Sequence, residues 1–404
     1  MKIHKLWALL FAVMLIAAAC GGGDEGGADG GEDGAAGGGS ELPQEIGEGE
    51  GELNLIAWSG YVESGTNDKA FDWVTPFEKK TGCKVNVKYG DTSDEMVTLM
   101  KQGGGTVYDG VSASGDASNR LIAGGDVAEI NTELIPGYAD VMPSLESPGH
   151  NTVDGKHYGV PYLWGPNVLM YNTEVVTEKP TSWDVTWEAD SPYAGKVTAY
   201  DSPIFIADAA MYLMAHEPDL DITDPYELTS EQLDAAVELL QEQSEAIGKY
   251  WALYSDEIDG FASDDLVIGT AWPYQVNVLQ SDKHPVEAVF PQEGMTGWAD
   301  TWMMSSNAEH PNCMYEWMDW TMTPGVQAEA AAWFGGTPSL TTACDPLQAS
   351  IGKAARTVYH CGDDDFLSDI FLWKTPLPDC GDERGTTCTD YSEWTTRWQE
   401  VRGG

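Results

Sequence analysis

Two aromatic stretches far apart in the chain, 158–172 and 297–302, constrain its fold most. The first combines a rigid proline, the ring of Trp164 and a Gly-Pro turn before an apolar run of the length of a buried strand. The second places Trp298 and Asp300 two residues apart, hence on one side of an extended chain. A chain that crosses from one lobe to another needs such stiff, ring-bearing segments. The two stretches therefore predict the walls of one ligand cleft.

Strand and helix patterns alternate in the segment before the first stretch. The expected strands are 53–58, 83–89 and 108–111, and the expected helices are 71–80 and 94–101. This alternation predicts a mainly parallel α/β sheet. Ligands of such sheets bind at the carboxyl ends of strands, where Trp58, Ser59 and Ser114 stand.

The length of 404 residues favours two lobes of ordinary size. The apolar run after Pro166 and the stretch 297–302 mark where we expect the chain to cross between the two lobes. We predict an α/β fold whose first lobe comprises 53–165 plus 299–343 and whose second lobe comprises 166–298 plus 344–404.

The N-terminus predicts an export signal. Residues 1–20 contain a short basic segment, an apolar run shorter than a membrane span and small residues before Cys20. This pattern resembles the bacterial lipoprotein box, in which Cys20 carries the lipid; an ordinary signal peptide cut near an incidental cysteine is the alternative. Residues 21–52 are glycine-rich and acidic, and we expect them to form a disordered tether.

The formal net charge of −46 makes nucleic acid and anionic lipid surfaces poor partners. Cationic ligands are favoured, although salt screens the attraction at distance. A solvated acidic surface, as in proteins of high-salt organisms, also accounts for the charge.

Six cysteines remain beyond Cys20, an even number that predicts up to three disulfides in an exported protein. They are Cys83, Cys313, Cys344, Cys361, Cys380 and Cys388, and they allow 15 connectivities. Cys380 and Cys388 enclose a short turn-rich loop and form the first expected pair. Their spacings do not favour a metal site, and we expect the bridges chiefly to brace the C-terminal part.

The sequence contains no motif of a hydrolase, a metalloprotease, a nucleotide-binding loop or a dinucleotide-binding fold. Rings and polar side chains instead recur together at the ends of expected strands. Ring faces attract an ammonium group and a carboxylate fixes its charge, but rings alone suit a sugar equally well. A hydrolase with a carboxylate pair remains an alternative.

From about Leu53 onward the chain resembles the periplasmic spermidine/putrescine-binding proteins of polyamine ABC importers. The resemblance is carried by 57–62, by Thr81-Gly82, by Tyr108-Asp109 leading into Ser114, by 160–165, by 298–300 and by Thr337-Pro338. It implies the two-lobed periplasmic-binding-protein fold, with crossovers between the lobes, a central ligand cleft and closure by hinge bending. It implies no cofactor and no enzymatic activity.

The resemblance also assigns roles to individual residues. It implies that Trp58, Ser59 and Tyr61 form the first wall of the cleft and that Ser114 contributes a hydroxyl. Trp272 and Trp298 would stack on the ligand. Asp300 and Asp201 would each bind an amine through a carboxylate. The expected ligand-binding residues are Trp58, Ser59, Tyr61, Ser114, Asp116, Trp164, Asp201, Trp272, Trp298, Asp300 and Lys374.

Three positions depart from the pattern of the family. Asp116 stands where an aromatic residue is usual, Ile204 and Phe205 replace an acidic residue, and Lys374 replaces a neutral polar one. A lysine in the cleft would repel a polyamine.

These observations predict a monomeric, lipid-anchored, extracytoplasmic solute-binding protein that delivers a small cation, a polyamine or related amine, to an ABC transporter permease. The alternative within the same fold is a sugar or an amino-acid-like zwitterion, with Lys374 binding its carboxylate.

Overall fold

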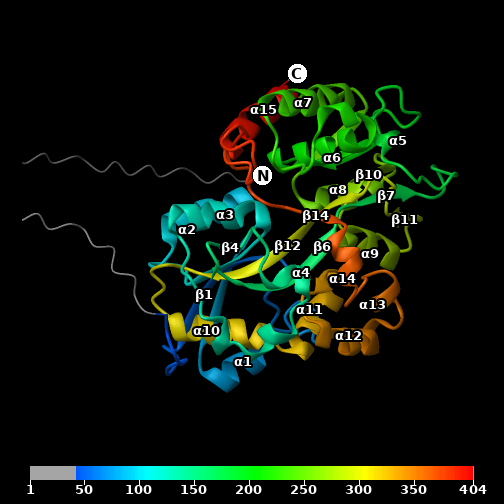
Figure 1. Ribbon diagram of the computed structural model, residues 1–404. Coiled ribbons are helices and arrows are strands. Elements are labelled where there is room, and N and C mark those ends of the chain that lie inside the picture. The colour runs from blue at the N-terminus through cyan, green and yellow to red at the C-terminus, as the bar shows by residue number, and fades with distance from the viewer. Residues whose placement is uncertain (1–41, 404) are drawn as a thin grey trace, which may run out of the picture. The chain divides into compact units, whose positions relative to one another are not determined.

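The computed structural model describes residues 42–403 (Figure 1). The expected signal 1–20, its Cys20 and the tether residues 21–41 lie outside this range. Within residues 42–403, no helix combines the length and the apolar character that crossing a membrane requires.

A seven-stranded sheet, the first sheet, has β12 at its centre and β1 near one edge. Strands β2 and β3 pair with β1 in parallel, one on each side, as the alternating pattern predicts. The order is β13-β6-β12-β3-β1-β2, with β14 paired to β12. Antiparallel pairing of β12 with β3 and β6 makes the sheet mixed rather than mainly parallel. Its strands are β1 (Glu52–Trp58), β2 (Lys84–Gly90), β3 (Gly110–Ala113), β6 (Val160–Pro166), β12 (Met295–Met304), β13 (Thr337–Pro338) and β14 (Ile370–Leu372).

A five-stranded sheet, the second sheet, has the order β11-β7-β10-β8-β9. Its strands are β7 (Val168–Asn172), β8 (Val197–Tyr200), β9 (Ile247–Trp251), β10 (Ile268–Ala271) and β11 (Val286–Val289). A separate hairpin joins β4 (Thr152–Val153) and β5 (Lys156–His157). Strand β7 is buried along its whole length, which explains its unbroken apolar sequence.

Helices surround both sheets (Figure 1). Those near the first sheet are α1 (Val74–Thr81), α2 (Ser93–Gly103), α3 (Gly115–Gly124), α4 (Pro143–Glu146), α10 (Pro311–Thr321), α11 (Pro324–Phe334), α12 (Cys344–Ile351), α13 (Ala354–Thr357) and α14 (Asp364–Ser368). Those near the second sheet are α5 (Asp184–Trp187), α6 (Ile206–His216), α7 (Ser230–Ser244), α8 (Tyr254–Ala262), α9 (Pro273–Ser281) and α15 (Tyr391–Gly403).

Local sequence signals set the ends of several helices. Thr229 and Gln232 form a capping box at the start of α7. Gly82 and Gly335 end α1 and α11 with the left-handed backbone that glycine tolerates, at φ angles of 77° and 87°.

The two sheets are joined where β6 passes into β7 and where β11 leads into β12. Asn167, between β6 and β7, donates its backbone N–H to the Thr296 carbonyl oxygen at 2.8 Å. Its side-chain amide donates to the Thr296 hydroxyl at 2.6 Å, and this hydroxyl donates to Asp208 of α6 at 2.9 Å. The two connections therefore run side by side.

Two sequence-based boundaries differ from the structure. We assigned 344–404 to the second lobe, but α12 packs on α11 and β14 pairs with β12, so 344–372 joins the first sheet. The tether expected over 21–52 is ordered from residue 42 onward. Both oxygens of Glu50 accept backbone N–H groups at the start of α10, from Asn312 at 3.0 Å and Cys313 at 2.9 Å. A carboxylate at a helix N-terminus is favourable, and this contact fixes the segment.

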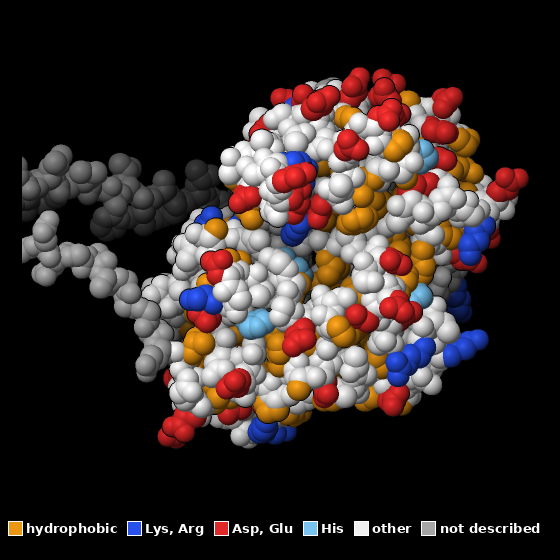
Figure 2. All heavy atoms as spheres, in the orientation of Figure 1, with side chains coloured by type: hydrophobic (Ala, Val, Ile, Leu, Met, Phe, Trp, Pro, Cys, Tyr) orange, Lys and Arg blue, Asp and Glu red, His pale blue; other side chains and the backbone are white. Residues whose placement is uncertain are grey.

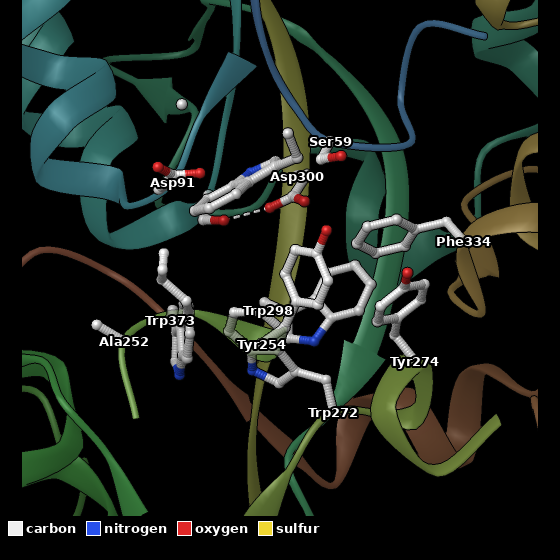
Figure 3. A pocket seen from close by; sticks show the side chains of 14 residues that line it. Ser59, Asp91, Ala252, Tyr254, Trp272, Tyr274, Trp298, Asp300, Phe334 and Trp373 are labelled. Atoms are coloured by element: carbon white, nitrogen blue, oxygen red, sulfur yellow. Dashed lines mark hydrogen bonds between the residues drawn. The ribbon is translucent and has the colours of Figure 1, made fainter. Parts of the chain in front are cut away.

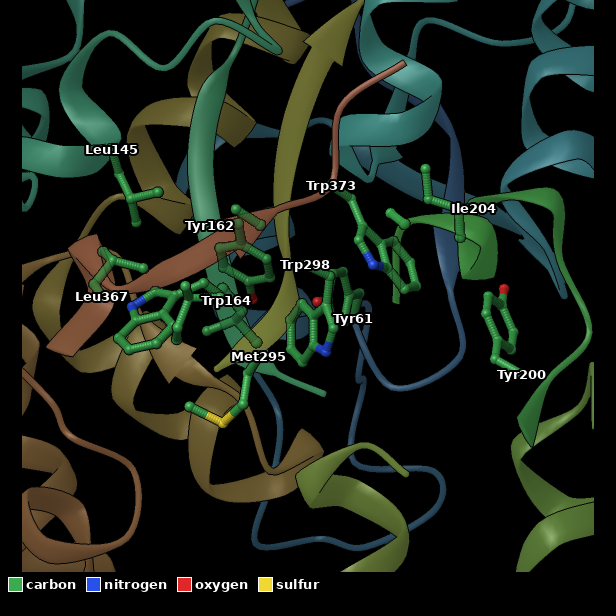
Figure 4. Packing of buried hydrophobic residues seen from close by; sticks show 14 of the residues in the cluster. Tyr61, Leu145, Tyr162, Trp164, Tyr200, Ile204, Met295, Trp298, Leu367 and Trp373 are labelled. Atoms are coloured by element: carbon green, nitrogen blue, oxygen red, sulfur yellow. The ribbon is translucent and has the colours of Figure 1, made fainter. Parts of the chain in front are cut away.

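The core is continuous and rich in aromatic rings, several of which are drawn in Figure 4. Three disulfides stabilise it: Cys83–Cys313, Cys344–Cys361 and Cys380–Cys388. The expected pairing of Cys380 with Cys388 is confirmed. The bridge from Cys83 spans 230 residues and links β2 to α10, so the bridges do not brace the C-terminal part alone.

Candidate functional site

A pocket opens where the carboxyl ends of several strands meet (Figure 3). From the first sheet it receives residues that follow β1, β2 and β3; from the second it receives residues that follow β9 and β10. This is the edge at which α/β sheets hold their ligands. Its lining consists of Trp58, Ser59, Gly90, Asp91, Ser114, Ala252, Leu253, Tyr254, Trp272, Tyr274, Trp298, Asp300, Phe334 and Trp373.

Asp300, in the middle of β12, is the buried carboxyl group of the pocket, with 3% of its surface exposed. The hydroxyl of Tyr61 donates to one of its oxygens at 2.5 Å, and the hydroxyl of Ser114 donates to the other. Burial raises the pKa of Asp300 to about 7, and the nearby charge of Asp116 adds to that rise, while the two hydroxyls oppose it.

A glycine turn brings Tyr61 to this carboxyl group. Gly60 has a φ angle of 94°, a conformation that favours glycine, and Tyr61 N–H donates back to the Trp58 carbonyl oxygen at 3.1 Å. The chain therefore turns directly after β1. Trp58 and Ser59 line the pocket, and Tyr61 lies behind Asp300 with no exposed surface.

Seven aromatic side chains line the pocket: Trp58, Tyr254, Trp272, Tyr274, Trp298, Phe334 and Trp373. They support one another: Tyr274 stacks on Phe334 at a centroid distance of 5.6 Å, and Trp298 meets Phe334 edge to face at 5.8 Å. Trp373 stacks on Tyr200 at 5.6 Å. Such contacts hold the rings in fixed positions around the space beneath Asp300 (Figure 3).

Two glycines make room for the ring of Trp298. A β-carbon at Gly165 would lie 2.6 Å from this ring, and one at Gly336 would lie 2.9 Å from it. Either side chain would push the indole out of its position. Gly165 therefore serves the pocket wall, and the turn expected at Gly165-Pro166 is wrong because both residues lie within β6.

Asp116 lies behind the pocket instead of in its wall. Only 2% of its surface is exposed, Ser93 donates to it at 3.0 Å, and Arg120 stands 3.8 Å away. Burial raises its pKa to about 6, although Arg120 and Ser93 oppose the rise. It therefore acts on the pocket through its charge.

Besides Tyr61 and Asp116, three further expected binding residues are not in the pocket wall. Trp164 has no exposed surface and donates to the Pro338 carbonyl oxygen at 3.2 Å, as a core residue does. Asp201 accepts from Trp398 and from Arg402 of α15, each at 3.1 Å.

Lys374 is the third, and two carboxylates bind its ammonium group. Asp224 lies 2.8 Å and Glu227 2.5 Å from it. Its neighbour Trp373 lines the pocket instead.

The structure adds residues that the sequence analysis did not assign, among them Asp91, Tyr254, Phe334 and Trp373. Asp91 directly follows β2, and Tyr254 begins α8 shortly after β9, so the strand-end argument that located Trp58 extends to them. Nothing in the local pattern distinguishes Phe334 or Trp373 from a core ring.

One group of side chains among residues 42–403 has the donor atoms of a metal site: Asp184, His216 and Glu293, all within 4.8 Å of one another. These atoms have protein partners. Tyr212 donates to Asp184 at 2.8 Å and Ser182 donates to Glu293 at 2.6 Å, and His216 lies 3.5 Å from Asp184 and 3.6 Å from Glu293.

Residues 72–354 match the family described as bacterial extracellular solute-binding protein. Among characterised proteins, the chain is 26% identical over 259 residues to "Spermidine/putrescine-binding periplasmic protein 1" of Haemophilus influenzae. That match covers 63% of this chain and 66% of the relative, slightly under two thirds of its length.

Solved structures share the fold. The structure named "Putative spermidine/putrescine ABC transporter from Listeria monocytogenes" superposes with a TM-score of 0.69 at 19% identity, over 87% of this chain and 99% of the other. A binding protein from A. tumefaciens in complex with glucopine gives 0.65 at 15% identity, over 87% and 99%. The expected two-lobed α/β fold of periplasmic binding proteins is confirmed. Because neighbours with such different names share it, the fold alone does not determine a ligand.

Proposed function

The chain belongs to the family of bacterial extracellular solute-binding proteins, and from that premise we propose that it is the solute-binding component of an ABC importer. Its pocket, between the two lobes, holds a small organic amine cation, with the polyamines putrescine and spermidine as the leading candidates. The name of the Haemophilus relative and the chemistry of the pocket support the same class of ligand.

The observation that carries this proposal is the position of Asp300 within a ring-lined space. Ring faces attract an ammonium group by about 0.5–2 kcal/mol each, and the carboxylate neutralises its charge at the buried end. An ammonium group that replaces the proton of Asp300 also offsets the desolvation that raises the pKa of this group.

The alternative ligands, an amino-acid-like zwitterion and a sugar, have no comparable partner in the pocket. No Lys, Arg or His occurs among the described residues that line it, and Lys374, expected to bind a ligand carboxylate, is bound by Asp224 and Glu227. A zwitterion therefore has no cation to receive its acid group. A sugar fits the rings and its hydroxyls can donate to a carboxylate, but it brings no positive charge to offset the buried charge of Asp300.

Replacement of the buried carboxylate tests the proposal. Asp300→Asn removes the charge and is expected to weaken amine binding by about 1.5–3 kcal/mol, roughly 10- to 150-fold. Calorimetric titration with putrescine, spermidine and a neutral sugar measures the effect. The matched control is Asp201→Asn, the same chemical change at a carboxylate bound by Arg402, which is expected to leave the affinity unchanged. Equal affinity of wild type and Asp300→Asn would rule out this site.

Ligand-driven closure of the lobes gives the permease its signal in this proposal. Both lobes contribute rings to the pocket, so a bound cation gains its full set of contacts only when the lobes approach. The protein acts as a monomer and performs no chemistry on its cargo.

We further propose that Cys20 anchors the protein to the membrane by a lipid, as its position after the small-residue run supports. Expression of Cys20→Ser in a bacterial host is expected to move the protein from the membrane fraction to the soluble extracytoplasmic fraction. A variant that stays with the membrane would contradict the anchor.

A further inference from the structure

The carboxylates around the pocket are unequally available to a ligand. Asp300 and Asp91 are the acidic side chains in the described lining, and Asp300 alone of the two is buried. Asp91 is exposed, at the rim, where water and salt screen its charge. The pocket thus offers one desolvated negative charge.

The acidic groups nearby that might receive a second ammonium group have other partners. Asp201 is bound by Arg402 and by the indole N–H of Trp398, each at 3.1 Å. Asp116 is held by Ser93 at 3.0 Å and faces Arg120. Neither lines the pocket, and the next acidic position that the family leads one to expect is filled by Ile204, which has no exposed surface.

The wall away from Asp300 is apolar. Trp272 and Trp373 meet edge to face at 6.4 Å, and Leu253 and Ala252 lie beside them in the lining. Figure 3 shows Trp272, Trp373 and Ala252 below Asp300, and Figure 4 shows Trp373 among the rings of the core. A second ammonium group placed here would meet ring faces but no carboxylate, so the attraction of the rings would at most offset the loss of its water.

We propose that the pocket recognises only one ammonium group of its ligand. The ligand's cationic head binds Asp300 between the rings, and the remainder of the molecule is recognised as an alkyl chain, so a second charge adds nothing to the affinity. This inference rests on the proposed function, because it assumes an amine ligand in this pocket. It extends the cargo class from polyamines to monoamines with an apolar tail.

A matched pair of ligands isolates the second charge. Butylamine and putrescine have the same four-carbon chain, and putrescine alone carries an ammonium group at both ends. We would titrate the full folded chain with each by calorimetry, at equal ionic strength and at about pH 8, where Asp300 is ionised. The dissociation constants are expected to agree within about fivefold. Putrescine more than about fivefold tighter would overturn single-ended recognition while leaving the proposed function intact; no heat with either amine would overturn both.

The variant Asp91→Asn tests whether the exposed carboxylate at the rim of the pocket contributes to amine affinity. Because this side chain is exposed, the substitution is expected to preserve the fold and to weaken both amines by the same small factor. A loss confined to putrescine would show that Asp91 binds its second ammonium group, and would likewise overturn the inference.

Discussion

The carboxyl group of Asp300 is half-protonated near neutral pH when the pocket has no ligand, because its pKa is raised to about 7. A cation binds the ionised form. Below that pKa the ligand must therefore displace a proton, and the proposed binding becomes coupled to pH.

We expect amine affinity to weaken as the pH falls through about 7, with a limiting slope of about tenfold per pH unit, and to level off above it. Titrations in two buffers of different ionisation enthalpy would also reveal the proton that is released. In Asp300→Asn this dependence should largely disappear. Affinity that does not change between about pH 5.5 and 7.5 would contradict the coupling.

Single residues also show where sequence reasoning reaches its limit. Trp58 ends β1, and Ser59 and Ser114 follow β1 and β3, so the strand ends located by the pattern lead to residues of the lining. Asp201 also follows a strand, but Arg402 of the distant C-terminal helix binds it. Such a contact between residues far apart in the chain leaves no local signal. Which lining residues bind ligand stays a prediction.

Among the elements, the alternation over 53–111 predicted β1, α1, β2, α2 and β3 because apolar spacing and glycine stops mark each of them. The membership of 344–372 was not predictable in the same way. The pairing of β14 with β12 depends on the tertiary position of β12, and nothing in the short sequence of β14 specifies that neighbour.

The disulfides provide a prediction at this scale. Cys83–Cys313 closes 230 residues and Cys380–Cys388 closes 8. Loop-closure entropy predicts that removing the longer bridge costs about 3 kcal/mol more than removing the shorter one. Unfolding free energies of the two double Cys→Ser variants in urea measure this difference. Equal losses would indicate that local packing, rather than chain entropy, determines what each bridge contributes.

Across residues 42–403, four buried acidic groups have a raised pKa: Asp116 about 6, Asp208 and Asp300 about 7, and Glu257 well above its usual value, in each case chiefly through burial. Burial also lowers the pKa of His150 to about 4, which acts in the opposite direction. Because the four acidic groups outnumber this histidine, we expect the folded protein to bind more protons than the unfolded chain between about pH 4.5 and 7, and stability to fall as the pH rises through this range. The net charge of −46 adds self-repulsion in the same direction.

We expect the ligand-free protein to have a higher Tm at about pH 5 than at about pH 8. Thermal unfolding in high salt, which screens the acidic side chains spread over the surface in Figure 2, isolates the contribution of the buried groups. A Tm that is equal at the two pH values, or higher at about pH 8, would contradict the expected loss of stability with rising pH.

The central position of β12 has a consequence for the order in which the chain acquires structure. Strands β3 and β6 are made early in translation, but the strand that joins them, β12, ends at Met304. The nascent chain therefore lacks the centre of its first sheet until about three quarters of it has been synthesised. A polypeptide that cannot complete its fold before this point stays unfolded during most of its synthesis. Only an unfolded chain can pass through a narrow protein-conducting channel.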